Sequence, residues 1–215
     1  MNESSDSLSA GAARPISTRK LTLSDIADLR AYERERDQAR SDVIAMKHLR
    51  RLALGTMITV MFENRETMRY QIQEMARVEK LISDEEIQTE LDIYNSLIPE
   101  PGMLCATVFI ELTSDEAMRE WLPKLVGIES SLVFRLADGT QVRSRPEAQH
   151  AQQLTRAEMT SAVHYVEFEF TPAQIAVFAL GPTTLALDHT NYAEEIELLS
   201  SSRAELCRDL VSDSK

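Results

Sequence analysis

The alternation of apolar and polar positions predicts a series of strands along the chain. Residues 56–62 (TMITVMF) are apolar on both alternating faces and rich in β-forming side chains. This pattern is typical of a central strand that is covered on both sides. The other predicted strands are residues 104–112, a hairpin of residues 132–136 and 140–145 around Gly139, residues 162–170 and residues 183–187.

Helical periodicity and capping residues predict helices between these strands. The first begins near Leu21 and continues toward Gly55, and the second follows the turn Glu63-Asn64-Arg65 directly. Thr171 and Pro172 begin a short helix that Gly181 ends. The second helix covers residues 66–82, and the remaining helices are predicted at residues 84–97 and 115–126 and from about Asn191 to the end of the chain.

The mixed order of these elements favours an α+β fold. We expect a mainly antiparallel sheet of about five or six strands, packed with helices that include one at each end of the chain. The 215 residues are the size of one domain. Residues 20–215 are therefore predicted to form a single domain, and residues 1–19, which are polar and of low complexity, a disordered tail.

Charge and cysteine content exclude several classes of function. The chain has 35 acidic and 23 basic residues, a net charge of −12, which disfavours binding to nucleic acid. Its one basic cluster, residues 47–51 (KHLRR), is interpreted as a solvated helix end. No segment has the length and hydrophobicity of a transmembrane helix or a secretory signal, so we expect a cytoplasmic protein without membrane contact. Cys105 and Cys207 form no CxxC pair, and the sequence requires no cofactor.

The helix predicted for residues 66–82 carries polar groups on its apolar face. Glu79 falls near the middle of the apolar arc and Gln71 lies inside it, whereas Tyr70 and Glu74 lie on an adjoining face. A buried carboxylate has to be paired, hydrogen-bonded or protonated. Two interpretations remain. Glu79 either docks the helix through an ion pair with Arg36, Arg51 or Arg65, or Glu79 or Glu74 is a base or metal ligand in a polar pocket.

Glu63, Asn64 and Arg65 lie where a strand ends and a helix begins. Such junctions are common places for anion or substrate sites, because the first N–H groups of a helix have no partner within the helix. These three residues are therefore candidates for a binding site.

Histidines give a further set of candidates. His164 lies on the apolar face of its strand, where a neutral, hydrogen-bonded core histidine is the favoured interpretation. Asp188 and His189 follow a strand end, and capping explains much of that segment. With Glu79, the two histidines make a set of the type that holds iron or zinc, but no pair has diagnostic ligand spacing. The sequence also lacks GxGxxG, P-loop and GxSxG motifs.

Several segments resemble one bacterial family, that of domain of unknown function 3501. They are, in order, FENRETMRYQIQEMARVEK, YNSLIPEPG, TVFIEL, LVGIE, SAVHYVEF and DHTNY, between about Leu21 and Leu210. Met103 departs from the pattern, which has an acidic residue there. The family pattern includes Glu63, Asn64, Arg65, Tyr70, Gln71, Gln73, Glu74, Glu79, His164, Tyr165, Asp188 and His189.

The resemblance implies no particular reaction, because the family is defined by the absence of an assigned function. Its genes are often found beside those of rubrerythrin and of iron–sulfur, heterodisulfide-reductase-like proteins, which implies a part in peroxide handling or electron transfer. Two hypotheses follow. The first is a non-enzymatic accessory protein that binds rubrerythrin or an iron–sulfur protein. Under this hypothesis the chain can also associate with copies of itself as a homo-oligomer. The second is an enzyme, or a small-molecule- or metal-binding protein, with a pocket formed by Glu63, Arg65, Glu74, Glu79, His164 and His189.

Overall fold

The computed structural model describes residues 19–149, 155–156 and 159–211. Most strands belong to two antiparallel sheets. Sheet A has the order β1 (Arg51–Leu54), β2 (Ile58–Glu63), β3 (Met103–Ile110), β9 (Val163–Glu169) and β6 (Arg145–Pro146). Sheet B has the order β11 (Tyr192–Glu197), β10 (Thr183–His189), β4 (Leu132–Leu136) and β5 (Gln141–Arg143). A short ribbon pairs β7 (Thr155–Arg156) with β8 (Met159–Thr160).

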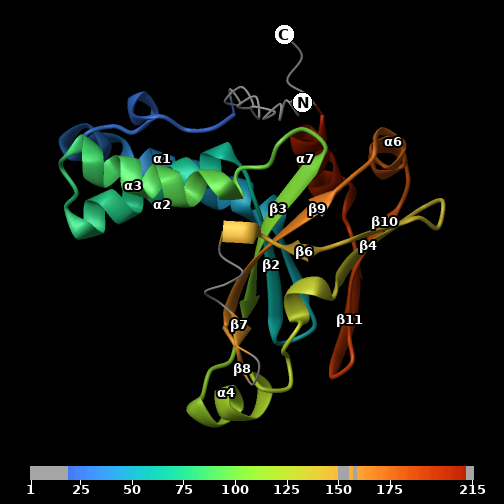
Figure 1. Cartoon of the computed structure of the whole chain (residues 1–215). Coiled ribbons are helices and arrows are strands. Elements are labelled where there is room, and N and C mark those ends of the chain that lie inside the picture. The colour runs from blue at the N-terminus through green and yellow to red at the C-terminus, as the bar shows by residue number, and fades with distance from the viewer. Residues whose placement is uncertain (1–18, 150–154, 157–158, 212–215) are drawn as a thin grey trace, which may run out of the picture.

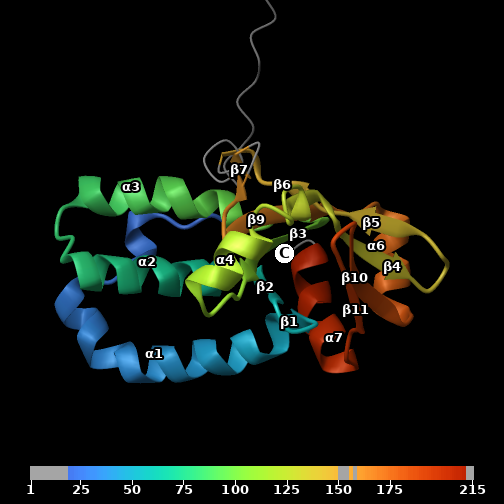
Figure 2. The same cartoon turned by 90° about the horizontal axis from the view of Figure 1, so that it is seen from below.

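The helices lie outside the two sheets, and some of them cover the outer face of sheet A. They are α1 (Leu29–Arg50), α2 (Arg65–Glu79), α3 (Asp84–Tyr94), α4 (Asp115–Trp121), α6 (Pro172–Leu180) and α7 (Ser200–Leu210). Short 3-10 turns occupy Leu23–Asp25, Asn95–Leu97 and Ile128–Ser130. Helices α1, α2 and α3 lie side by side and project from one side of sheet A, with α2 between the other two (Figures 1 and 2).

The two sheets enclose the main core. Its centre is a cluster of aromatic rings, in which Phe134 contacts Phe62, Phe168, Phe170 and Phe178 at centroid separations of 4.8–5.7 Å. Such tilted and edge-to-face pairs add to the stabilisation that burial alone provides.

A tyrosine joins the open edges of the two sheets. The hydroxyl of Tyr192, on β11, donates to the carbonyl of Leu54 at 2.9 Å and accepts from the backbone N–H of Thr56 at 3.1 Å. Gly55 between them has φ +66°, and a Cβ there would lie 2.3 Å from the Tyr192 hydroxyl oxygen. Glycine is therefore required by both the backbone conformation and the close approach of the two edges.

The outer face of sheet A carries a second, smaller core. There Met68 and Ile72 of α2 pack with Leu91, Leu97 and Ile98. Because helices cover one face of β2 and sheet B covers the other, all six of its residues are buried. The prediction of a strand covered on both sides is thus confirmed.

The predicted α+β class with antiparallel pairing is confirmed, and the strands divide between two sheets rather than one. The helix predicted from about Asn191 is wrong at its start, because a strand lies there. His189, the last residue of β10, pairs across a two-residue turn with Tyr192, the first residue of β11. Pairing with β10 prevails there over the helical propensity of an acidic segment. The first helix begins at Leu29, with Asp28 as its cap, and ends at Arg50. It is followed directly by β1, a strand that the sequence analysis did not predict.

The predicted disordered tail, residues 1–19, lies outside the described residues except for Arg19, and the single domain of residues 20–215 stays a prediction. Within the described part of the chain, none of the helices combines the length and the apolar composition needed to cross a bilayer.

Candidate functional site

A pocket of about 270 Å³ lies between the outer face of sheet A and the helices that cover it. The floor of the pocket is a row of residues on four neighbouring strands. In the strand register Arg51 pairs with Met61, Met61 with Thr107, and Thr107 with Tyr165. Side chains directly opposite on neighbouring strands lie on the same face. The full lining is Lys47, Arg51, Met61, Glu63, Met68, Gln71, Tyr94, Leu97, Thr107, Phe109, Val163 and Tyr165.

Glu63, the last residue of β2, brings a carboxylate into this pocket. The side chain is buried, and the hydroxyl of Thr107 donates to its Oε1 at 2.7 Å. Its Oε2 is also buried, and no group among the described residues donates a hydrogen bond to it. A buried acceptor without a donor costs about 1–3 kcal/mol, more when charged.

Helix α2 begins directly after Glu63 and forms the roof. The Asn64 side chain accepts from the backbone N–H of Thr67, and Thr67 Oγ1 accepts from the backbone N–H of Asn64, each at 2.9 Å. This reciprocal cap fixes the direction in which the helix leaves the strand. As a result Met68 and Gln71 lie over the sheet and line the pocket.

Two phenols complete the polar part of the lining. Burial raises the pKa of Tyr165, with the nearby Tyr94 and Glu63 adding to the effect. Burial also raises the pKa of Tyr94, against a smaller lowering by its hydrogen bond to Gln71. Both phenols therefore keep their O–H at neutral pH.

The edge of the pocket along β1 carries positive charge. Lys47, in the last turn of α1, is half-buried with its Nζ 6.0 Å from the centroid of the Tyr70 ring. Arg51 is exposed; its guanidinium lies 5.6 Å from the Phe109 ring centroid and pairs with Glu111 at 2.8 Å. The pocket thus combines a buried acceptor, apolar walls and a cationic edge.

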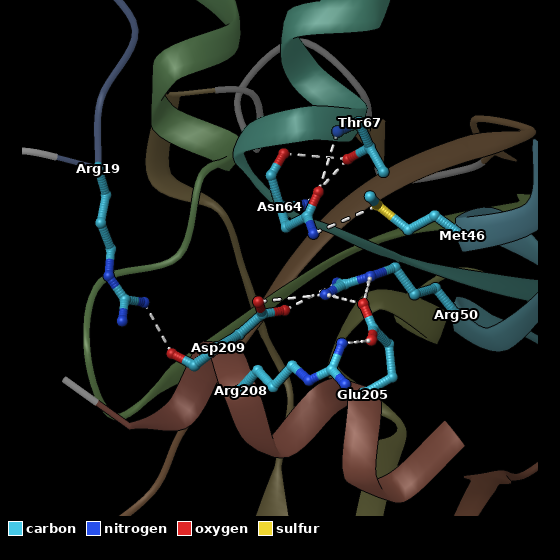
Figure 3. Close-up of polar contacts among 8 residues, drawn as sticks. All are labelled: Arg19, Met46, Arg50, Asn64, Thr67, Glu205, Arg208 and Asp209. Carbon is cyan, nitrogen blue, oxygen red and sulfur yellow. Dashed lines mark hydrogen bonds and ion pairs between the residues drawn. The ribbon is translucent and has the colours of Figure 1, made fainter. Parts of the chain in front are cut away.

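A second polar cluster lies nearby, at the end of α1. Arg50 is 1% exposed, and its guanidinium donates to Glu205 at 3.1 Å and to both carboxylate oxygens of Asp209 at 2.7 and 3.1 Å. Figure 3 shows these side chains, with Arg208 donating to Glu205 from the other side at 2.7 Å. The prediction of a solvated helix end at residues 47–51 is therefore wrong for Arg50. This arginine fixes α7 to the end of α1.

Comparison with known proteins gives a family. The model of the family described as "Protein of unknown function (DUF3501)" matches residues 20–210. The chain belongs to this family. It is also similar to a crystal structure of a novel protein of unknown function from Burkholderia pseudomallei K96243. The two share 35% sequence identity over 89% of this chain and 99% of the other, with a TM-score of 0.82. No curated protein matches the chain.

The candidate residues of this DUF3501 chain separate into several places. Glu63 and Gln71 line the pocket, whereas Asn64 and Arg65 face a different cavity of about 290 Å³, beside Arg50 and α7. Arg65 pairs with Asp25 at 2.6 Å. Asn64 also donates to Met46 Sδ at 3.5 Å (Figure 3), so that its side chain joins α2 to α1.

Glu74 fixes α2 to α1. Arg36 donates to its two oxygens at 2.7 and 2.8 Å, and the hydroxyl of Tyr32 donates at 2.7 Å. The hydrogen bonds from Arg36 have the largest effect on Glu74 and, together with that from Tyr32, lower its pKa to about 2. Tyr70 lies between this group and Lys47. The ion pair with Arg36, which one of the two interpretations of the sequence gave to Glu79, is formed by Glu74 instead.

The predicted burial of Glu79 is wrong, since its side chain is exposed. Val78 and Ile82, which helical periodicity places on the same arc as Glu79, are 67% and 83% exposed. In the last turn of α2 only one side is covered: Ala76 is buried, whereas Val78 and Glu79 face solvent. On the buried side, Gln73 takes the polar position instead, exchanging hydrogen bonds with the backbone of Ala27 at 2.7 and 3.1 Å.

The two histidines lie away from Glu63. His164 is buried on the opposite face of sheet A, its Nε2 2.9 Å from the Ser161 carbonyl and 2.7 Å from the Thr160 hydroxyl. Burial lowers its pKa, and the prediction of a hydrogen-bonded core histidine is confirmed. His189 Nε2 lies 3.0 Å from the Val126 carbonyl, and Asp188 pairs with both terminal nitrogens of Arg143.

The predicted metal set of His164, His189 and Glu79 is therefore not assembled. No group of three His, Cys, Asp or Glu side chains suited to a metal ion occurs among the residues that the structure describes. Cys105, which pairs with Glu63 across β2 and β3, has its pKa raised by burial to about 12, so its thiol stays protonated and unreactive at neutral pH.

Sequence analysis did not select several pocket residues. Thr107 lies inside an apolar strand, and its polarity on the face that also carries Cys105 and Phe109 was an available signal. Tyr94 lies on the side of α3 that packs on the second core, a position where an aromatic side chain is ordinary. Lys47 and Arg51 belong to the basic cluster that was interpreted as solvated.

Proposed function

We propose that this protein binds a small molecule in the pocket beneath α2, and that Glu63 Oε2 accepts a hydrogen bond from that molecule. The single observation that supports the proposal is a buried carboxylate oxygen, at a cavity, to which no described residue donates. Buried polar atoms in folded proteins are nearly always hydrogen-bonded, and exceptions are enriched at functional sites. A donor on the ligand offsets the cost that the unpaired oxygen imposes on the free protein.

The lining narrows the type of ligand. A carboxylate oxygen accepts from N–H or O–H, and an amine or amidine adds charge attraction. Met61, Met68, Leu97, Phe109 and Val163 provide apolar walls that suit an aromatic stem. A volume of about 270 Å³ is at the small end for ligand pockets, so the ligand is a small molecule, not a nucleotide or a peptide.

Benzylamine is a probe with these features. We expect the protein to bind it with a Kd on the order of 1 mM, as is usual for a ligand of this size. Substitution Glu63→Gln should weaken binding by about tenfold or more, because it removes a hydrogen bond to a charged group. Calorimetric titration of both proteins measures the effect.

Glu120→Gln is the matched control, since it makes the same change at an exposed residue of α4, far from α2 in Figure 1. Its affinity for benzylamine should equal that of the unchanged protein. Equal affinity of Glu63→Gln and Glu120→Gln, or no binding of benzylamine by the unchanged protein, overturns the proposal.

A second candidate is the accessory role in a redox or peroxide-defence module, in the cytoplasm. Its support is the exposure of Ile82 and Val78 beside a groove lined by Leu23, Ile26 and Leu81. Exposed apolar side chains next to a groove are a feature of protein–protein contacts. The identity of the partner, rubrerythrin or an iron–sulfur protein, comes from the resemblance alone, as does the possibility of a homo-oligomer.

Affinity capture from native extract of the encoding organism tests this role. The tagged chain should recover rubrerythrin or its iron–sulfur neighbour, identified by mass spectrometry, and Ile82→Glu should abolish recovery. Leu180→Glu, at an equally exposed position of α6, is the control. Failure to recover either protein, or equal recovery by the two variants, contradicts the role.

A further inference from the structure

We propose that the ligand is bipolar: it carries an anionic group that Lys47 binds at the edge of the pocket, in addition to the donor group that Glu63 accepts. This inference rests on the proposed function, and it names the class of ligand that the same pocket selects. Aromatic or short aliphatic amino acids, and amines that bear a carboxylate or phosphate, belong to this class.

The distribution of charge within the lining is the first support. Glu63 is 5% exposed, whereas the two cations of the lining are more accessible: Lys47, at the end of α1, is half-buried, and Arg51, at the start of β1, is exposed. The pocket therefore has its negative group buried and its positive groups near solvent. A ligand with charges of the opposite arrangement matches both ends, and the apolar walls between them match its stem.

The state of Lys47 is the second support. Arg51 is already paired with Glu111, but no carboxylate among the described residues lies within ion-pair distance of Lys47. Its neighbour is the face of the Tyr70 ring, 6.0 Å from Nζ, on the first half of α2. Because the lysine stem is half-buried, its ammonium group is held near the pocket rather than free to range over the surface.

Continuity of the backbone holds this arrangement together. Lys47 is in the last turn of α1, and the next segment of the chain is β1 of sheet A. Arg50, three residues after Lys47, is fixed by Glu205 and Asp209, so the end of α1 is anchored. The position of the Lys47 ammonium relative to Glu63 is therefore set by packed elements and not by a loop.

Pairs of probes that differ by one carboxylate test the inference. The 3- and 4-isomers of (aminomethyl)benzoate carry the amine of benzylamine and add a carboxylate. The distance between the amine and the carboxylate differs between the two isomers. At low salt, at least one isomer should bind about 2- to 5-fold more tightly than benzylamine, the gain of a partly exposed ion pair. Raising the salt concentration should reduce this gain, because screening weakens an exposed pair.

Lys47→Met keeps most of the apolar stem and removes the charge. In this variant the ratio of the two affinities should fall to about one, whereas Lys124→Met, at an exposed lysine that pairs with Glu120, should keep the full ratio. Equal or weaker binding of both isomers than of benzylamine overturns the bipolar ligand, and a ratio that survives Lys47→Met overturns the role of Lys47. Failure of benzylamine itself to bind is a different result, which contradicts the proposed function.

Discussion

Two polar clusters lie close together beside sheet A, and they differ in how their charges are satisfied. At the end of α1, the buried guanidinium of Arg50 donates to Glu205 and to both carboxylate oxygens of Asp209 on α7, and Arg208 donates to the second oxygen of Glu205. Under α2, Glu63 is as deeply buried, but only one of its oxygens has a donor. In the first cluster every carboxylate oxygen has a donor within the chain, whereas in the second one buried oxygen has no donor among the described residues.

Under the proposed function, this difference distinguishes a structural polar cluster from a binding one. Both clusters include ionisable side chains at positions where an ordinary core has apolar ones, and both adjoin a cavity of similar size. Burial and charge alone therefore do not distinguish them. The distinguishing feature is the balance of donors and acceptors, because evolution retains an unpaired buried acceptor mainly where something binds to it.

The largest expected effect is that of breaking the Arg50 cluster. Arg50→Ala leaves Glu205 and Asp209 buried without their cation and should lower the free energy of unfolding by about 3–5 kcal/mol. Arg51→Ala, the next residue, breaks an exposed pair and should cost less than about 1 kcal/mol. Denaturant titration measures both, and equal losses would show that the cluster does not stabilise the fold.

An intermediate effect is expected from the pair of Arg36 and Glu74. The pKa of Glu74 is lowered to about 2, so its contribution to stability is present above the unfolded value near 4.5 and is lost as the pH falls toward 2. Comparing the chain with Glu74→Gln at pH 7 and pH 3 should show a difference in unfolding free energy of about 1–3 kcal/mol that shrinks at pH 3. A difference independent of pH contradicts the ion pair.

The smallest effect on stability is expected at the Glu63 cluster. Glu63→Gln replaces a buried carboxylate by a neutral amide, which costs less to bury, and the amide oxygen can still accept from Thr107. The free energy of unfolding should stay within about 1 kcal/mol of the original value or increase. A loss as large as that of Arg50→Ala would mean that Glu63 is a structural residue.

Much of the fold follows from the sequence, because β2, β3 and β9 have apolar patterns that only buried strands explain. The site follows only in part. Glu63 and Gln71 were selected from a strand end and a helix face. Thr107 is 44 positions away from Glu63, and only the antiparallel register brings its hydroxyl to the carboxylate.

The failures have physical causes as well. Periodicity placed Glu79 on the apolar face of α2, but a helical arc is buried only where another element covers it, and in the last turn Glu79 faces solvent. The end of α1 shows the converse case. Arg50 lies in a basic cluster that suits a solvated helix end, and two carboxylates in the C-terminal helix bury it instead. Local periodicity does not show which helix faces are covered by another element, or which charged side chains pair with a distant segment.

A crystal structure of the protein with benzylamine tests the central claim most directly. The amine nitrogen should lie within hydrogen-bonding distance of Glu63 Oε2, roughly 2.7–3.2 Å, with the ring between α2 and the outer face of sheet A. An amine bound elsewhere, or a Glu63 Oε2 that already accepts a hydrogen bond from a protein group, would contradict the account.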